Sequence, residues 1–240
     1  EYNENGFTIL DYKLSEDDLE DIKLAHKNLT DKHPEYIDYC PMLLAYDLNF
    51  LKYARDKNIL DCVSQVIGPD IALWNQSFFA KPPQVGTRTP WHQDGQYWPM
   101  RPLATCSVWI AIDDATTENG CLRFLPGTHR SRDLSEHHFN DASDLALPLE
   151  LDSSTIDESR AVDIELLAGQ ISLHDVFLIH GSESNQSSKP RRAMTLRFMP
   201  TTSVYHRNIA NSGNSSVEDL RTLYLMRGRD VSGENDFRVR

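Results

Sequence analysis

The stretch Trp91-His92-Gln93-Asp94-Gly95 carries the pattern from which the fold and the chemistry of this chain can be worked out. His92 and Asp94 are two residues apart, so on an extended strand their side chains point to the same side. One more imidazole from a distant strand would complete a face of two histidines and one carboxylate. That ligand set suits a non-haem ferrous ion and leaves coordination positions open for chemistry, which favours an oxygenase.

His180 supplies the candidate third ligand. It ends an apolar run, residues 176–179, that is predicted to be a strand, and a polar loop follows it. Arg191 comes eleven residues later, at the start of the next predicted strand. A hairpin returning over the loop would place this guanidinium near the metal but behind it. There it suits the far carboxylate of an α-keto dicarboxylate whose keto and C1 carboxylate groups chelate iron.

Three segments, WHQDGQYWP, ENGCLRFLPGTHR and HGSESN with RRA following, resemble the phytanoyl-CoA dioxygenase family of Fe(II)/2-oxoglutarate oxygenases in order and spacing. The similar segments reach from Gly6 to Met199. The resemblance implies an α+β, mainly β fold: a double-stranded β-helix (jelly-roll, cupin-like) core with flanking N-terminal helices. It also implies that the iron ligands are His92, Asp94 and His180.

The same resemblance implies a cosubstrate site. Arg191 is expected to bind the distal carboxylate of 2-oxoglutarate, with Trp109 beside the cosubstrate. Ser182 is expected to add a hydroxyl to that carboxylate, and Ser77 to line the cosubstrate. Fe(II), 2-oxoglutarate and O2 are the implied cofactors. Halogenating relatives of this fold replace the carboxylate ligand by a small residue, so the presence of Asp94 favours hydroxylation or another oxidation without halide.

Several residues are rival assignments at these positions. His174 is six residues before His180, which predicts the same strand face, but it lacks the polar loop that follows His180. Its expected place is behind the ligands. Arg192 should face away from Arg191 on its strand and would replace it only if the register were off by one. Of the other histidines, His129 is expected to bond the backbone or a carboxylate, and His137 and His138 are expected to be solvated.

The segment 95–101 is predicted to form one wall of a substrate chamber. Arg101 would bind an anionic group, and Tyr97 and Trp98 would accept an ammonium through cation–π contact, with Gln96 beside them. A small zwitterion, such as an aminoalkyl or trimethylaminoalkyl phosphonate, fits these features. No basic cradle for the phosphates of coenzyme A is visible, which favours a free small molecule.

Two other functions are weighed against this one. The first is a jelly-roll protein that binds a metabolite without turning it over. The second is a cupin-type metalloenzyme that does not use 2-oxoglutarate. The complete ligand set and Arg191 argue against both. Oligomeric state is left open.

Composition limits the partners and the compartment. With 24 basic and 36 acidic side chains, the formal charge of the 240 residues is −12, which argues against nucleic acid and anionic membrane surfaces. No apolar run reaches membrane-spanning length. The four cysteines are widely separated and form no CxxC, so free thiols in a reducing, cytoplasmic compartment are expected.

The order of predicted elements is two helical segments followed by strands, which is typical of an α+β domain. We expect one domain over 1–240, with a helical part at about 1–70, the jelly-roll core at about 71–200 and an extension at 201–240. The segment 130–160 is polar and is predicted to be a surface excursion of the kind that often covers a site. The predicted elements are a strand at 6–10, helices at 16–30 (capped by Ser15) and 48–67, a strand at 71–80, a hairpin of 104–113 with 121–125 around Asn119-Gly120, strands at 161–166, 171–179 and 193–199, and a short helix at 217–226.

Overall fold

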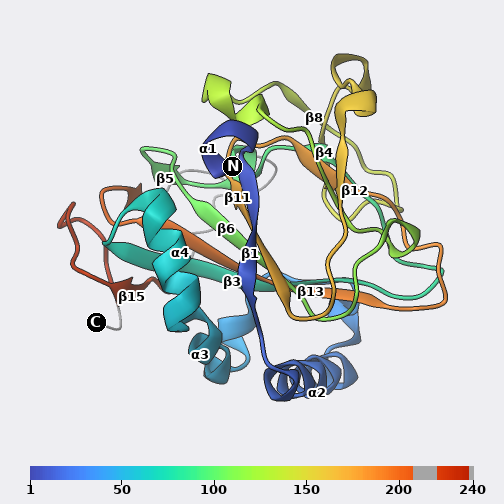
Figure 1. Cartoon of the computed structure of the whole chain (residues 1–240), viewed down its shortest axis with the longest axis horizontal. Coiled ribbons are helices and arrows are strands. Elements are labelled where there is room, and N and C mark those ends of the chain that lie inside the picture. Colours follow the sequence, from blue (N-terminus) through green and yellow to red (C-terminus); the bar gives the residue numbers. More distant parts are fainter. Residues whose placement is uncertain (208–220, 238–240) are drawn as a thin grey trace.

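The computed structural model, drawn in Figure 1, describes residues 1–207 and 221–237. Most of its strands form two sheets in which all neighbouring strands are antiparallel. The larger sheet has the order β1 (Phe7–Lys13), β11 (Gln170–Asp175), β6 (Cys106–Ala111), β13 (Arg191–Pro200), β3 (Ile71–Lys81) and β15 (Tyr224–Arg227), and β2 (Tyr39–Cys40) also pairs with β3. The smaller sheet has the order β10 (Val162–Ile164), β7 (Leu122–Phe124), β12 (His180–Ser182) and β4 (Thr89–His92).

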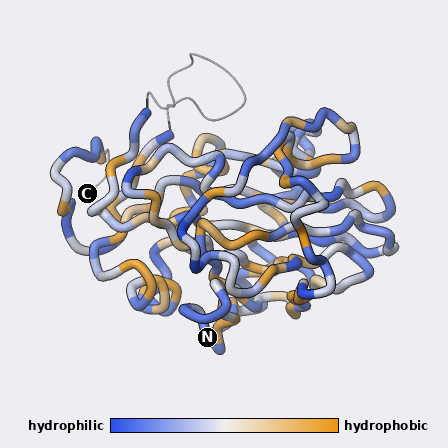
Figure 2. The backbone as a smooth tube through the Cα atoms, turned by 90° about the horizontal axis from the view of Figure 1, so that it is seen from above, coloured by the Kyte–Doolittle hydropathy of each residue, from blue (hydrophilic) through white to orange (hydrophobic). Residues whose placement is uncertain are grey.

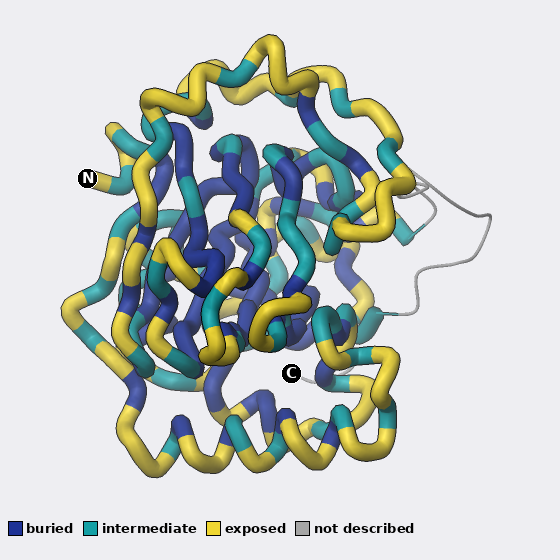
Figure 3. Tube along the Cα trace, turned by 90° about the vertical axis from the view of Figure 1, so that its right-hand side faces the viewer, coloured by how far each residue is buried: buried dark blue, intermediate teal, exposed yellow. Residues whose placement is uncertain are grey.

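The expected mainly β, jelly-roll architecture with N-terminal helices is confirmed. Helices α2 (Glu16–Lys32), α3 (Leu51–Ala54) and α4 (Lys57–Ile67) pack on the larger sheet, and α1 (Tyr2–Asn5) precedes β1. The hydroxyl of Ser15 accepts a hydrogen bond from the backbone N–H of Asp18 at 3.1 Å, as an N-cap does. Figure 3 shows α2 at the bottom with its exposed residues facing away from the sheet.

Side chains along β13 alternate between the two faces of the larger sheet, and each face borders a different buried region. Met194 and Leu196 belong to a buried apolar cluster with the helices, whereas Thr195 and Arg197 line a pocket between the sheets. Successive strand residues point to opposite faces, so one strand serves both layers. Figure 2 shows hydrophilic residues predominating in the outer loops, with hydrophobic stretches on helices and strands.

The helical region predicted at about 48–67 is confirmed, but it consists of several helices and not of one. The chain forms the short helix η3 (Leu48–Phe50) and α3, and then starts again at α4. Asp56 makes the break, because its carboxylate accepts hydrogen bonds from the N–H groups of Asn58 (2.8 Å) and Ile59 (3.1 Å). An aspartate that caps the next helix cannot also continue the previous one.

The predicted hairpin of 104–113 with 121–125 is wrong. Strand β6 pairs with β11 and β13, whereas β7 pairs with β10 and β12, so the chain crosses from one sheet to the other between them. The turn itself matches its residues, because Gly120 has a φ of +80° and Asn119 completes a capping box with Thr116. Such crossings are what close a jelly roll.

Two further expectations need correction. Strand β11 ends at Asp175, and His180 opens β12 in the other sheet, so His174 and His180 do not share a strand. The expected helix at 217–226 lies partly outside the described residues, but its last residues belong to strand β15, where Tyr224 pairs with Leu73. Pairing with the open edge of β3 overrides the local helical pattern.

The excursion at 130–160 folds back beside β4. It contains the hairpin β8 (His137–Phe139) and β9 (Leu149–Leu151), and the N–H of Arg88, just before β4, donates to the carbonyl of Asp144 at 2.9 Å. The remaining short elements are η1 (Pro34–Tyr36), η2 (Leu43–Ala45), η4 (Asp94–Tyr97), β5 (Met100–Arg101), η5 (Thr117–Asn119), η6 (Thr128–Ser131), η7 (Ser153–Thr155), η8 (Glu158–Arg160) and β14 (Val204–Tyr205).

Cys40, Cys62, Cys106 and Cys121 are all free thiols, as expected. In the part of the chain that the structure describes, no helix combines the length and the apolar character needed to cross a bilayer.

Candidate active site

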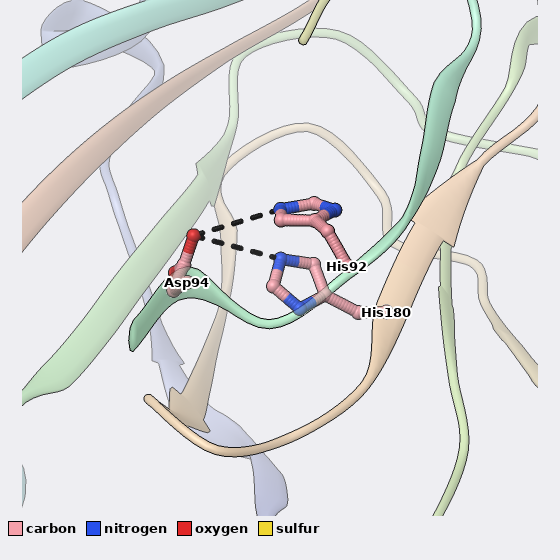
Figure 4. A group of neighbouring side chains, drawn as sticks. All are labelled: His92, Asp94 and His180. Carbon is pink, nitrogen blue, oxygen red and sulfur yellow. Dashed lines mark ion pairs between the residues drawn. The ribbon is translucent and has the colours of Figure 1, made fainter. Parts of the chain in front are cut away.

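His92, Asp94 and His180 lie together between the sheets (Figure 4). His92 ends β4 and His180 opens β12, and the two residues are direct partners in an antiparallel pair. Asp94 follows at the start of η4, with Oδ1 3.6 Å from Nε2 of His92 and 4.0 Å from Nε2 of His180. The three ligand atoms lie within 4.8 Å of one another, and all three residues are buried.

The histidine tautomers make this cluster suitable for a cation. Nδ1 of His92 lies 2.8 Å from the carbonyl of Pro90, and Nδ1 of His180 lies 2.9 Å from that of Leu178. A carbonyl only accepts, so each Nδ1 carries the proton and each Nε2 presents a lone pair. Burial, and then the neighbouring His92, hold the pKa of His180 well below its usual value. The two Nε2 lone pairs and the carboxylate oxygen all carry negative charge density, so they repel each other unless a cation lies between them. A metal ion is the cation that this ligand set suits.

The other oxygen of Asp94 is held by the larger sheet. Oδ2 accepts a hydrogen bond from Ser107 at 3.2 Å and lies 3.5 Å from Nε2 of His174. Burial alone would raise the pKa of Asp94, but the nearby imidazoles, His174 first, hold that pKa well below its usual value. The carboxylate is therefore ionised, with Oδ1 turned toward the histidines. His174 thus contacts the ligand carboxylate from a different strand, as a support behind it.

A pocket between the two sheets opens on this cluster. It is bounded by both sheets and, at one point, by Leu147 of the excursion. The lining residues are Phe79, Thr89, His92, Asp94, Ser107, Trp109, Leu122, Leu147, His174, His180, Ser182, Arg191, Thr195 and Arg197.

Arg191 lies in this pocket as a buried cation. Its Nε donates to the carbonyl of Gly120 at 3.1 Å, its Nη1 to that of Phe79 at 3.3 Å, and its guanidinium lies 5.7 Å from the ring centroid of Trp109. Among the described residues, no carboxylate lies within ion-pairing distance of it. Burial lowers the pKa of Arg191 to about 10, so it remains charged at neutral pH. A buried guanidinium without an anion suits the carboxylate of a bound dicarboxylate.

Local backbone geometry fixes this arginine. Gly120 presents its carbonyl from a left-handed conformation, and a Cβ there would collide with the carbonyl of Glu183. Arg192 points the other way and binds Asp113 with two hydrogen bonds of 2.8 Å. The register therefore places Arg191, not its neighbour, in the pocket.

Of the other three residues expected at the cosubstrate, two line the pocket and one does not. Trp109 and Ser182 line the pocket. Ser77 is fully buried behind the lining, where its hydroxyl lies 2.7 Å from that of Thr195 and accepts a hydrogen bond from Nη1 of Arg197 at 2.7 Å.

The four residues predicted for the substrate are not among the lining residues. Tyr97 donates to the carbonyl of Leu149 at 3.0 Å, and Trp98 packs edge-on against Trp74 at 4.8 Å. Gln96 is half-buried beside them. Arg101 is exposed, and its Nη1 donates to the carbonyls of residues 98 and 100 at 3.0 and 2.6 Å. Substrate roles for these four stay predictions.

The histidines outside the cluster have other partners. Nε2 of His129 lies 3.3 Å from the carbonyl of Asn3, which agrees with the expected backbone bond. His137 was expected to be solvated, but its Nε2 accepts a hydrogen bond from the backbone N–H of Gln93 at 3.0 Å. His138 is exposed and lies 3.4 Å from Glu150.

Among the lining residues that the sequence analysis did not name, Arg197 and Leu147 differ in whether a signal was present. Arg197 is six residues after Arg191, and this even spacing on one strand was a signal that both point inward. Leu147 carried no signal, because only the folded path of the excursion brings it to the pocket.

Comparison with known proteins assigns the family. The family model described as Phytanoyl-CoA dioxygenase (PhyH) matches residues 2–193. The chain belongs to the PhyH family. The mouse protein "Phytanoyl-CoA dioxygenase, peroxisomal" is 27% identical over 97% of this chain and 81% of its own length. A Dictyostelium discoideum "Phytanoyl-CoA dioxygenase domain-containing protein 1 homolog" is 31% identical over 64% of this chain and 56% of its own length.

Solved structures agree on the PhyH fold. The apo form of ThoJ, a non-haem monooxygenase, superposes with a TM-score of 0.75 at 22% identity, covering 99% of this chain and 85% of ThoJ. EvdO2 from Micromonospora carbonacea, solved with 2-oxoglutarate, has a TM-score of 0.68 at 26% identity, covering 83% and 88%. The chain is thus an iron- and 2-oxoglutarate-dependent oxygenase of the PhyH family with a His-Asp-His site.

Proposed function

We propose that this PhyH enzyme hydroxylates a free small molecule. The balanced reaction converts a substrate C–H group, 2-oxoglutarate and O2 into the alcohol, succinate and CO2. The observation that carries the proposal is that a His-Asp-His cluster and an unpaired buried guanidinium share one pocket. Neither feature is stable without a partner, and iron and 2-oxoglutarate supply one partner each.

Separate residues are proposed to bind the metal and the cosubstrate. His92 and His180 offer Nε2, and Asp94 offers Oδ1 to the metal. Iron with 2-oxoglutarate and O2 supplies the oxidising chemistry. Arg191 binds the distal carboxylate bidentately and so orients the dicarboxylate, with Trp109 and Ser182 beside it. The apolar walls exclude water around the reacting groups.

The substrate class is proposed from the charged and aromatic residues at and near the pocket. A zwitterion such as an aminoalkyl or trimethylaminoalkyl phosphonate is the proposed example, free in the cytoplasm and not bound to coenzyme A. Asp94 keeps halide out of the carboxylate's place, so hydroxylation is the proposed outcome.

An anaerobic titration tests the cofactor assignment. Addition of Fe(II) and 2-oxoglutarate to the protein should produce a weak visible charge-transfer band, and Asp94→Ala should abolish it together with substrate-dependent succinate formation. Asp175→Asn is the matched control, because Asp175 is a buried carboxylate that pairs with Arg132 at 3.0 Å instead of facing the histidines. A metabolite-binding protein without turnover, or a metalloenzyme that ignores 2-oxoglutarate, would give no band. Full turnover in Asp94→Ala would remove Asp94 from the reaction.

A further inference from the structure

Arg197 is a second arginine in the active-site pocket. Its side chain is 6% exposed, and it lines the same pocket as Arg191. The two residues are six apart on β13, so both point between the sheets. Nη1 of Arg197 donates to the hydroxyl of Ser77 at 2.7 Å. That hydroxyl is neutral, and the charge of Arg197 acts on the carboxylate of Asp94 only at longer range, without an ion pair between them.

The surroundings of Arg197 are aromatic. The centre of its guanidinium lies 5.2 Å from the ring centroid of Trp98, 5.5 Å from that of Phe79 and 6.0 Å from that of Trp74. Among the described residues, no carboxylate lies within ion-pairing distance of it. Cation–π contacts contribute about 0.5–2 kcal/mol each but do not neutralise a charge taken out of water. The arrangement therefore holds a cation ready for an anion.

The register shows which part of the site Arg197 serves. Arg197 pairs with Ser107 of β6, and Ser107 pairs with His174 of β11. Ser107 and His174 are the residues that contact Oδ2 of Asp94. The backbone of Arg197 therefore lies at the end of the larger sheet that is next to the metal ligands. The backbone of Arg191 lies six residues before that of Arg197 on β13, which is about 20 Å at about 3.3 Å per residue. The two arginines therefore enter the pocket from different positions along β13, and both guanidinium groups lie near Phe79.

One cosubstrate does not account for both cations. 2-Oxoglutarate has one carboxylate beyond the pair of groups that chelates iron, and in the proposed function Arg191 takes it. We infer that Arg197 anchors an anionic group, such as a carboxylate, sulfonate or phosphonate, on the molecule that is oxidised. This inference rests on the proposed function and deepens it, and it moves the predicted anion site from exposed Arg101 to a buried residue. The substrate class is thus a small organic anion, whether or not it also carries an ammonium.

Binding of defined probes tests the inference. The protein is loaded anaerobically with Fe(II) and 2-oxoglutarate, and 3-aminopropylphosphonate, 3-aminopropanesulfonate, 4-aminobutyrate and the neutral 3-aminopropan-1-ol are titrated. Tryptophan fluorescence is the readout, because Trp74 and Trp98 lie beside Arg197. At least one anionic probe should bind and the neutral one should not. Arg197→Gln should weaken that binding at least about tenfold, about the strength of one charge-assisted pair.

The matched control is Arg130→Gln, which removes one positive charge from an exposed surface position. It should leave probe binding unchanged, and Arg197→Lys should retain part of it. Equal binding in wild type and Arg197→Gln overturns the inference. Failure of every anionic probe to bind the wild type at about 10 mM also overturns it.

Cosubstrate affinity separates the two proposals. Arg197→Gln should bind 2-oxoglutarate within about twofold of wild type, whereas Arg191→Gln should lose it. If Arg197→Gln lost 2-oxoglutarate to the same extent, Arg197 would be binding the cosubstrate, and the inference would fail while the proposed function stood. If the wild type did not bind 2-oxoglutarate with iron, the proposed function would fail.

Thermal stability separates binding from a structural role. An unpaired buried charge weakens the fold, so Arg197→Met should melt at the wild-type temperature or above while losing the anionic probe. A lower melting temperature together with loss of 2-oxoglutarate binding would mark Arg197 as structural and overturn the inference.

Discussion

Nε2 of His174 lies 3.5 Å from Oδ2 of Asp94, the oxygen that Ser107 also contacts. Oδ1 of the same carboxylate faces His92 and His180. One carboxylate is thereby divided between the metal site and the larger sheet. Residues that orient a ligand in this way typically change metal affinity by 10- to 100-fold when they are removed.

His174→Leu should therefore weaken Fe(II) binding by about 10- to 100-fold and lower turnover without abolishing it. The measurement is an Fe(II) titration of the charge-transfer band at saturating 2-oxoglutarate. His129→Gln is the control, because His129 is also buried but bonds the backbone carbonyl of Asn3. Unchanged Fe(II) affinity in His174→Leu would show that Asp94 is oriented without it.

The neighbouring arginines allow a paired test of the cosubstrate site. Arg191→Gln should raise the Kd for 2-oxoglutarate by about 30- to 150-fold, because it removes a buried bidentate partner worth about 2–3 kcal/mol. Arg192→Gln should leave that Kd unchanged, since Arg192 binds Asp113 on the opposite face. Calorimetry with Mn(II) in place of Fe(II) measures both values. A larger effect from Arg192→Gln would mean that the register of β13 differs by one residue.

His26 predicts an acid-sensitive step in stability. Burial, and then the charge of Arg192, lower the pKa of His26 from 6.5 to about 4, and its Nε2 has no hydrogen-bond partner among residues 1–207 and 221–237. The folded state then binds fewer protons than the unfolded state between pH 4 and 6.5. This part of the stability is fully present above pH 6.5 and is lost as the pH falls toward 4, by at most about 3 kcal/mol. Urea unfolding across this range should show a shallower pH dependence for His26→Leu, and equal slopes would contradict the expectation.

Asp56 predicts a stability effect far from the chemistry. It caps α4 and also accepts a hydrogen bond from the hydroxyl of Tyr12 at 2.7 Å. Asp56→Ala should lower the free energy of unfolding by about 1–2 kcal/mol, while Asp47→Ala, at a single-turn helix, should lower it by less. Denaturant unfolding at pH 7 gives both numbers. An unchanged midpoint for Asp56→Ala would show that packing alone holds α4.

Local pattern was sufficient for several features of the fold. The helix 16–30 was predicted within two residues of α2, because its cap and its apolar spacing lie within one segment. The long strand at 71–80 was predicted for the same reason, since β-branched and aromatic residues run up to a proline. Pairing was less readable, since residues 104–113 and 121–125 join different sheets although they are neighbours in sequence.

The candidate site divides in the same way. The sequence predicted the ligand set and Arg191 through short motifs and their spacing, although Asp94 lies in η4 and not on the strand that His92 ends. Only the tertiary structure decided that His174 reaches Asp94 from another sheet, that Arg101 lies at the surface, and that Arg197 lines the pocket. The physical reason is that these contacts depend on which distant strands pair and in what register, and hydrogen bonding between strands carries no mark in the local order of residues.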